Sequence, residues 1–285
     1  MPRPFDIPPP LPLAAQRGQT FVSLVELMQR LLAPDGCPWD REQDPRSLRR
    51  YVLEEACEVI DAIDAIGSGG DPGALADELG DLALQIVFLA ELGRKEARFG
   101  PDDVVRGICE KLVRRHPHVF GDVTVSGSEE VLRNWDEIKR QERRDRPLLD
   151  GIPRALPALL RAAKMSEKVS QVGFDWPDGR GSREKVTEEL AELDAAVRSG
   201  DGARVAEELG DVLFALVNLG RHHGVDPEEA LAGTADRFRA RFDHVERRVK
   251  ERHGDWPRNE HGRPARGLPL GELDGYWNEA KRGAP

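Results

Sequence analysis

Two stretches of this sequence repeat each other, and the repetition constrains the fold more than any other feature. YVLEEACEVIDAI (51–63) matches KVTEELAELDAAV (185–197), and ADELGDLALQIVFLAEL (76–92) matches AEELGDVLFALVNLGRH (206–222). Two further blocks follow in the same order, KLVRRHPHV (111–119) with RFRARFDHV (237–245) and NWDEIK (134–139) with YWNEAK (276–281). Four blocks in one order indicate a tandem duplication, so we expect two similar folded units.

Periodicity and composition predict that both copies are helical. Apolar residues recur at spacings of three and four, aromatic residues make up only 6% of the chain, and β-branched runs are scarce. A turn or capping residue before a proline marks helix starts at Asp71-Pro72, Gly100-Pro101 and Asp226-Pro227. We therefore expect an all-α protein made of tandem helical bundles. The predicted helices span residues 19–33, 46–66, 72–97, 101–116, 128–145, 155–171, 182–199, 201–223, 226–252 and 271–282.

Helix-breaking residues predict the domain boundaries. The stretch from Arg146 to Pro157 holds the densest interior group of prolines and glycines. The N-terminal segment is rich in proline and polar residues, which is typical of an extended arm. We predict a Pro-rich arm at 1–19, a first domain at 20–146, a linker at 147–157 and a second domain at 158–285.

Charge and cysteine content argue against several classes of protein. Lys and Arg number 42 against 52 Asp and Glu, and the net charge of -10 disfavours binding to nucleic acid. No stretch approaches the apolar length of a membrane span, and no apolar export segment follows the N-terminus. The three cysteines are an odd number and form no CxxC pair. We expect a cytoplasmic protein without a membrane partner.

Acidic residues form a regular pattern on two neighbouring predicted helices. Glu54 and Glu55 precede Glu58 by four and three residues, so these side chains share one helix face, about 5–6 Å apart at Cβ. Glu78 and Asp81 repeat this spacing on the next helix. Like charges at such spacings destabilise a helix, and oxygen ligands without His or Cys suit Mg²⁺ or Mn²⁺. The alternative is a solvated acidic face. The second copy has the same pattern at Glu188, Glu189, Glu192, Glu208 and Asp211.

Several basic and aromatic residues of the second copy allow two interpretations each. Lys185 lies four residues before Glu189, where it could reach a phosphate or form an ordinary ion pair. Arg237 and Arg241 could clamp phosphate or remain solvated. Trp277 could stack on a base or anchor the last helix in a core.

The motifs together resemble a known family. EEACE with ELGD, and EELAE with ELGD, are similar to the EExxE and ExxD signatures of the all-α nucleoside triphosphate pyrophosphohydrolases. GCPWDREQ (36–43), VGFDWPD (172–178) and the late Trp-x-x-x-Lys motifs resemble the MazG family in particular. The resemblance covers about residues 20–282. One departure is Asp44-Pro45, where the family usually has Thr-His.

This resemblance implies a Mg²⁺-dependent enzyme, with Mn²⁺ as a possible substitute. It implies a homodimer that hydrolyses NTPs and dNTPs to monophosphate and pyrophosphate. Carried over by motif, the metal ligands are Glu189, Glu192, Glu208 and Asp211, and in the first copy Glu55, Glu58, Glu78 and Asp81. The implied substrate contacts are Lys185, Arg237, Arg241, Trp277 and Lys281.

The chemistry of triphosphate hydrolysis suggests further roles. A carboxylate beside the metal can accept the proton of the attacking water, and Glu188 or Glu189 is the candidate base. We expect the second copy to carry out most of the turnover, because Tyr51 occupies the position of Lys185 in the first copy. Lys111 and Arg115 do stand in for Arg237 and Arg241 there.

Three other functions are weighed against this one. A related all-α enzyme could act on a narrower substrate, as dUTPases and phosphoribosyl-ATP pyrophosphohydrolases do. A carboxylate-bridged di-iron bundle normally uses Glu-x-x-His, a spacing that this sequence lacks. A non-enzymatic helical interaction module would show no metal-dependent turnover.

Overall fold

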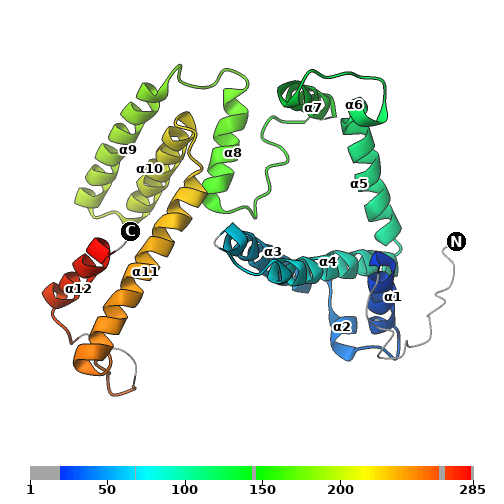
Figure 1. Ribbon diagram of the computed structural model, residues 1–285. Coiled ribbons are helices and arrows are strands. Elements are labelled where there is room, and N and C mark those ends of the chain that lie inside the picture. The colour runs from blue at the N-terminus through cyan, green and yellow to red at the C-terminus, as the bar shows by residue number, and fades with distance from the viewer. Residues whose placement is uncertain (1–19, 68, 143–145, 263–266, 284–285) are drawn as a thin grey trace. The chain divides into compact units, whose positions relative to one another are not determined.

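The computed structural model describes residues 20–67, 69–142, 146–262 and 267–283, and over these residues the chain contains helices and no β-strand (Figure 1). The all-α prediction is therefore confirmed. The chain divides into two compact units, residues 1–144 and 145–285. The predicted arm at 1–19 lies outside the described residues. None of the helices in the described ranges is both long and apolar enough to cross a membrane.

The first unit is built around two long helices. Helices α3 and α4 pack side by side, and α1 and α5 contact α4 (Figure 1). The helices of this unit are α1 (Phe21–Leu31), α2 (Pro38–Glu42), α3 (Pro45–Gly67), α4 (Pro72–Lys95), α5 (Pro101–Arg115), α6 (Pro117–Phe120) and α7 (Ser128–Glu142).

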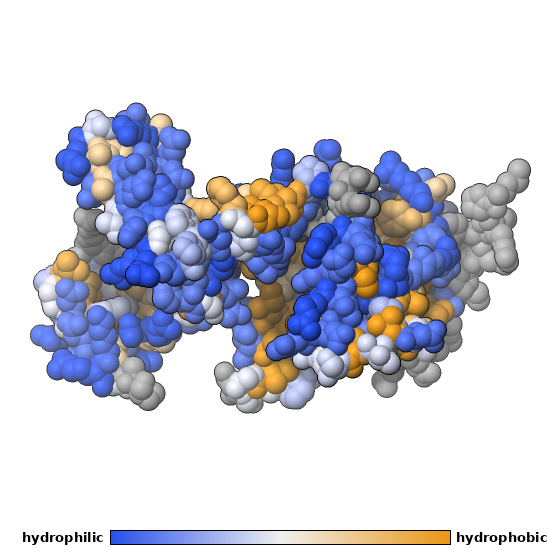
Figure 2. All heavy atoms as spheres, turned by 90° about the horizontal axis from the view of Figure 1, so that it is seen from above, coloured by the Kyte–Doolittle hydropathy of each residue, from blue (hydrophilic) through white to orange (hydrophobic). Residues whose placement is uncertain are grey.

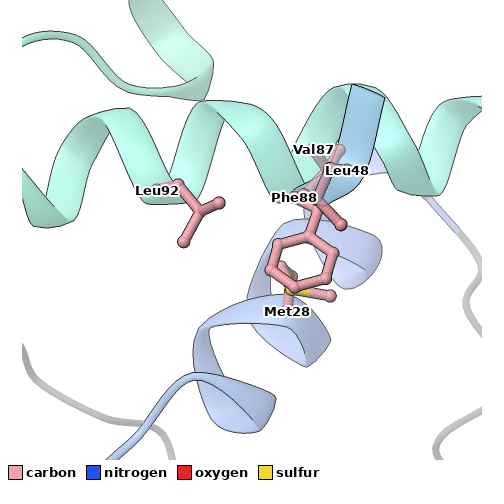
Figure 3. Packing of buried hydrophobic residues seen from close by; sticks show 5 residues of the cluster. All are labelled: Met28, Leu48, Val87, Phe88 and Leu92. Atoms are coloured by element: carbon pink, nitrogen blue, oxygen red, sulfur yellow. The ribbon is translucent and has the colours of Figure 1, made fainter. Parts of the chain in front are cut away.

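The core of the first unit joins α1, α3 and α4. Figure 3 shows Met28 of α1 and Leu48 of α3 meeting Val87, Phe88 and Leu92 of α4. Each of the five side chains is almost fully buried. Burial of a side chain of this size stabilises the fold by about 1.5–3 kcal/mol. This cluster therefore fixes α3 against α4, the two helices that carry the first acidic pattern.

Aspartate caps begin several of the helices. The Oδ1 atom of Asp44 accepts hydrogen bonds from the backbone N–H groups of Arg46 and Ser47, at 2.8 and 2.7 Å. Asp44-Pro45, the departure from the family motif, thus supplies the start of α3. Asp71 likewise accepts from the N–H of Gly73 at the start of α4. The proline-based helix starts predicted at 72, 101 and 227 are confirmed.

In the second unit, α9 and α10 form a closely packed pair. Helix α8 packs against α10 and α11, and α12 contacts α11 (Figure 1). Gly200, at a φ of 74°, ends α9 in the left-handed region that favours glycine, and Asp201 then caps α10. The helices of this unit are α8 (Ala158–Ser170), α9 (Gly179–Ser199), α10 (Gly202–His222), α11 (Pro227–His253) and α12 (Leu270–Gly283).

A second apolar cluster holds α11 and α12 together. Val245 and Val249 of α11 are buried against Tyr276 of α12. Trp256 and Trp277 pack against the edge of this cluster. This packing places the late Trp-x-x-x-Lys motif beside α11.

Some helix boundaries differ from the predicted ones. Helix α9 begins at Gly179 rather than at residue 182, because the Asp178 carboxylate accepts from the Arg180 N–H and caps the helix earlier. Helix α8 begins at residue 158 rather than 155, because Pro157 disfavours helical geometry at the residue before it. The short helices α2 and α6 were not predicted, since four or five residues carry no periodic signal.

Both helix pairs expose apolar side chains. Figure 2 shows apolar residues gathered in patches on the surface. On α9 and α10, Leu190, Leu209 and Leu213 are between 44% and 48% exposed. Ile60 of α3 and Ile86 of α4 are similarly exposed. Each pair therefore has an apolar face that its own unit does not cover.

Candidate metal and nucleotide site

Three carboxylates converge between α9 and α10. Oxygen atoms of Glu189 and Glu192 from α9 and of Glu208 from α10 all lie within 4.8 Å of one another. Glu189 and Glu208 are only 5% and 8% exposed, whereas Glu192 is exposed. The group therefore has two buried members and one that opens to solvent. Asp211, one helical turn beyond Glu208, lies outside this group of three.

Two cations contact this group. The Nζ atom of Lys185 lies 2.7 Å from oxygens of both Glu188 and Glu189. Hydrogen bonds to Glu188 and then Glu189 raise the pKa of Lys185 above its ordinary value, so the side chain is charged at neutral pH. On α10, the Nε atom of Arg204 lies 3.5 Å from an oxygen of Glu208. Sequence reasoning missed Arg204, although its spacing of four from Glu208 was a usable signal.

The first copy assembles the matching carboxylates without these two cations. Oxygens of Glu55, Glu58 and Glu78 lie within 4.8 Å of one another. The pKa of Glu55 is raised, first by burial and then by the negative charges of Asp81 and Glu58. Asp81 lies outside the group of three, but its charge acts on Glu55. The pKa of Glu78 is raised in the same way, by burial and then by Glu58 and Asp81.

Tyr51 and Ala74 occupy the first-copy positions of Lys185 and Arg204. Tyr51 packs against the core of the first unit, and its ring meets that of Trp39 at 6.0 Å with an edge-on geometry. Arg50 also lies over the Tyr51 ring, 4.5 Å from its centre. Tyr51 is therefore a packing residue, in contrast to Lys185.

A separate basic and aromatic group lies on α11 and α12. The charged ends of Arg241 and Lys281 lie 5.8 and 5.9 Å from the centre of the Trp277 ring. Phe238 lies 5.0 Å from the same ring. Trp277 also packs against the α11–α12 core. Both interpretations of Trp277 thus have a structural basis, because the ring anchors α12 and also faces cations.

Other members of the predicted set have local partners. Arg237 donates a hydrogen bond to Thr234 Oγ1 at 2.8 Å, one turn before Arg241 on α11. In the first copy, Lys139 lies 4.1 Å from the centre of the Trp135 ring, which repeats the pairing of Lys281 with Trp277. Arg115 is instead bound to Glu142 of α7. Apart from Lys185, the basic residues that the family motif implies therefore lie on other helices than the carboxylates.

The chemistry of the carboxylate groups fits a hard divalent cation. Three carboxylate oxygens from two helices supply the ligands that Mg²⁺ and Mn²⁺ prefer. A donor set of this size is too small to fill an octahedron, which leaves positions for water and substrate phosphates. The residues present in both copies therefore fit such an ion.

Comparison with known proteins identifies the family. A model of the MazG nucleotide pyrophosphohydrolase domain matches residues 43–120, and a phosphoribosyl-ATP pyrophosphohydrolase model matches residues 175–238. The nucleoside triphosphate pyrophosphohydrolase of Escherichia coli (strain K12) is 42% identical over 265 residues, which cover 91% of this chain and 96% of that protein. The chain belongs to the MazG family of nucleoside triphosphate pyrophosphohydrolases.

A second relative of this MazG-family chain comes from Thermotoga maritima. That protein, named nucleoside triphosphate pyrophosphohydrolase/pyrophosphatase MazG, is 40% identical over 270 residues, covering 94% of this chain and 98% of its own length. The predicted family and class of enzyme are thus confirmed. The two family models fall on different copies, and each matched range contains one complete acidic pattern.

Proposed function

We propose that this MazG-family chain hydrolyses NTPs and dNTPs to the monophosphate and pyrophosphate, with Mg²⁺ held by the second-copy carboxylates. The observation that carries the proposal is the convergence of oxygens from Glu189, Glu192 and Glu208 within 4.8 Å. Asp211 lies one turn from Glu208, where a change of side-chain rotamer can add a fourth ligand. Mn²⁺ has the same ligand preferences and can replace Mg²⁺.

The surrounding residues can perform the remaining steps. A bound divalent ion neutralises triphosphate charge and acidifies a coordinated water. Glu188 or Glu189 accepts the proton of the attacking water, and Lys185 Nζ lies 2.7 Å from an oxygen of each of these carboxylates. Lys185 can donate to a phosphate oxygen. This chemistry needs positioned water and cations but no side-chain nucleophile.

The group on α11 and α12 is suited to the rest of the nucleotide. Arg237, Arg241 and Lys281 supply positive charge for the departing phosphates. The face of Trp277 offers a stacking surface for the base. The exposed Phe238, which contacts Trp277, extends this aromatic surface.

The first copy is proposed as a second metal-binding site with weaker catalysis. Glu55, Glu58 and Glu78 repeat the converging geometry, and Asp81 lies close enough to influence Glu55. Tyr51 cannot contribute the positive charge that Lys185 supplies. Most turnover should therefore take place in the second copy.

We also propose a cytoplasmic homodimer without nucleic-acid or membrane partners. The exposed apolar residues of α9 and α10, such as Leu209 and Leu213, form a face that a second copy of the chain would cover. Sedimentation equilibrium should give twice the chain mass, and a monomer at micromolar concentration would contradict the proposal. The three free cysteines suit a reducing compartment.

One observation favours a second candidate substrate. The model that matches residues 175–238 describes phosphoribosyl-ATP pyrophosphohydrolases, so phosphoribosyl-ATP is a candidate for the second copy. The similarity to nucleoside triphosphate pyrophosphohydrolases extends over more than nine-tenths of the chain and therefore favours ordinary triphosphates.

A nucleotide panel separates these substrates. The full-length protein is assayed against the four NTPs, the four dNTPs and phosphoribosyl-ATP, with Mg²⁺ and with EDTA. We expect turnover of several NTPs or dNTPs with Mg²⁺ and none with EDTA. Turnover of phosphoribosyl-ATP alone would favour the second candidate, and metal-independent turnover would contradict both.

A further inference from the structure

The two acidic groups have the same carboxylates but different charge environments. In the second copy, Lys185 and Arg204 contact two of the three converging carboxylates, Glu189 and Glu208. Glu188 also binds Lys185, so four carboxylates and two cations leave a local charge of about -2 there. In the first copy, Tyr51 and Ala74 take those two positions, so the matching three carboxylates lack these counter-charges.

The cations contact the carboxylates that a metal would use. Lys185 Nζ lies 2.7 Å from Glu189 Oε1, within charge-assisted hydrogen-bond distance. Glu189 is 5% exposed and the Lys185 side chain is 37% exposed, so water reaches this pair only from the lysine side. A divalent ion bound to the same carboxylate would be repelled by the ammonium group at close range. When a metal binds in the second copy, Lys185 must therefore either move away from Glu189 or stay there and lower the affinity for the metal.

A triphosphate provides an alternative partner for Lys185. Its phosphate oxygens are strong acceptors for an ammonium group, and a long flexible side chain can exchange one anion for another. Once Lys185 has turned to phosphate, Glu189 is free for the metal. Because coupling between two ligands is reciprocal, triphosphate should strengthen metal binding and metal should strengthen triphosphate binding.

We infer that Lys185 and Arg204 act as internal counter-ions of the second-copy site. They keep its affinity for divalent metal low until a triphosphate draws Lys185 away, whereas the first-copy site binds the metal without nucleotide. This inference rests on the proposed metal site and deepens it. It would make the working site respond to the metal–nucleotide complex rather than to free metal.

The test measures Mn²⁺ binding to the full-length protein without nucleotide, from the electron paramagnetic resonance signal of free Mn²⁺. We expect two classes of Mn²⁺-binding site. Glu58→Gln should remove the tighter class, and Glu192→Gln should remove the weaker one. In the double variant Lys185→Met/Arg204→Met, the weaker class should tighten by about tenfold, as expected for loss of competing charge-assisted contacts. Melting temperatures check that each variant is folded.

Matched variants control for general charge effects. Arg183→Met removes one positive charge two residues before Lys185, on another face of α9, and should leave both classes unchanged. Ala74→Arg adds the missing cation at an exposed position of α4 and should weaken the first-copy class. A non-hydrolysable triphosphate analogue should tighten the second-copy class in the native chain but not in Lys185→Met.

The outcomes distinguish failure of the inference from failure of the metal site. If Glu192→Gln removes a class but the double variant leaves its Kd within about twofold of the native value, the inference is overturned. If neither Glu58→Gln nor Glu192→Gln removes any Mn²⁺ binding, the proposed metal site is itself wrong, and the inference fails with it.

Discussion

Neutralising Glu192 should separate the cost to activity from the cost to stability. Its carboxylate oxygen lies within 4.8 Å of oxygens from both Glu189 and Glu208. Two unit charges at 4.8 Å repel by about 0.9 kcal/mol in water and by about 3.5 kcal/mol at an effective dielectric constant of 20. Because Glu192 is exposed, the lower value applies, and Lys185 and Arg204 offset part of it.

We therefore expect Glu192→Gln to raise the free energy of unfolding of the metal-free protein by about 0.5–1 kcal/mol. For a unit of this size, the melting temperature should rise by about 1–4 °C. Turnover should nevertheless fall at least about a hundredfold, because a metal ligand is lost. Mg²⁺ should also stabilise the variant less than the native protein, since ligand binding to the folded state adds stability.

The assay combines denaturation in EDTA with turnover in Mg²⁺. Glu184→Gln is the matched control, because Glu184 is an exposed acid of α9 outside the converging group. That variant should retain activity and stability close to native values. A lower melting temperature for Glu192→Gln, with turnover per folded molecule preserved, would show that the carboxylate is structural and would refute this reasoning.

Three further predictions concern other parts of the chain. Glu192→Gln should cost more turnover than Glu58→Gln in full-length protein, and the opposite order would assign the main site to the first copy. Hydrogen bonds from the guanidinium groups of Arg115, which has the larger effect, and Arg114 lower the pKa of Glu142 to about 2. Its contribution to stability should therefore be complete above about pH 4.5 and be lost as the pH falls toward 2, so Glu142→Gln should flatten the acid limb of a pH–stability curve. Phe88→Ala should destabilise the first unit by about 3–5 kcal/mol in urea denaturation, because a nearly fully buried ring is removed from its core, and a loss below about 1 kcal/mol would show that the site collapses.

Much of the fold was predictable because its signals are local. Pro72, Pro101 and Pro227 each begin a helix where the sequence indicated, since a proline at the first helical position loses no helical hydrogen bond. The start of α9 was missed because Gly179 and Gly181 have low helix propensity, although Asp178 caps a helix there. In each copy, carboxylates from both acidic helices come within 4.8 Å of one another, and the two copies use matching positions for this.

The less predictable features depend on contacts between helices and on side-chain conformation. Spacing placed Glu208 and Asp211 on one face of α10, but only the structure shows that Glu208 alone joins the converging group. Arg204 was overlooked because an Arg four residues before a Glu is common on solvated helices. The sequence alone shows that Tyr51 replaces the cation Lys185. The packing of Tyr51 against Trp39 is visible only in the folded structure.

The central claim is that the chain hydrolyses a nucleoside triphosphate between its α- and β-phosphates with a divalent metal. Its most direct test is phosphorus NMR of the products from one NTP that the protein turns over, in Mg²⁺. We expect one monophosphate and one pyrophosphate for each triphosphate consumed, and no reaction in EDTA. Orthophosphate and a nucleoside diphosphate as the first products would contradict the claim.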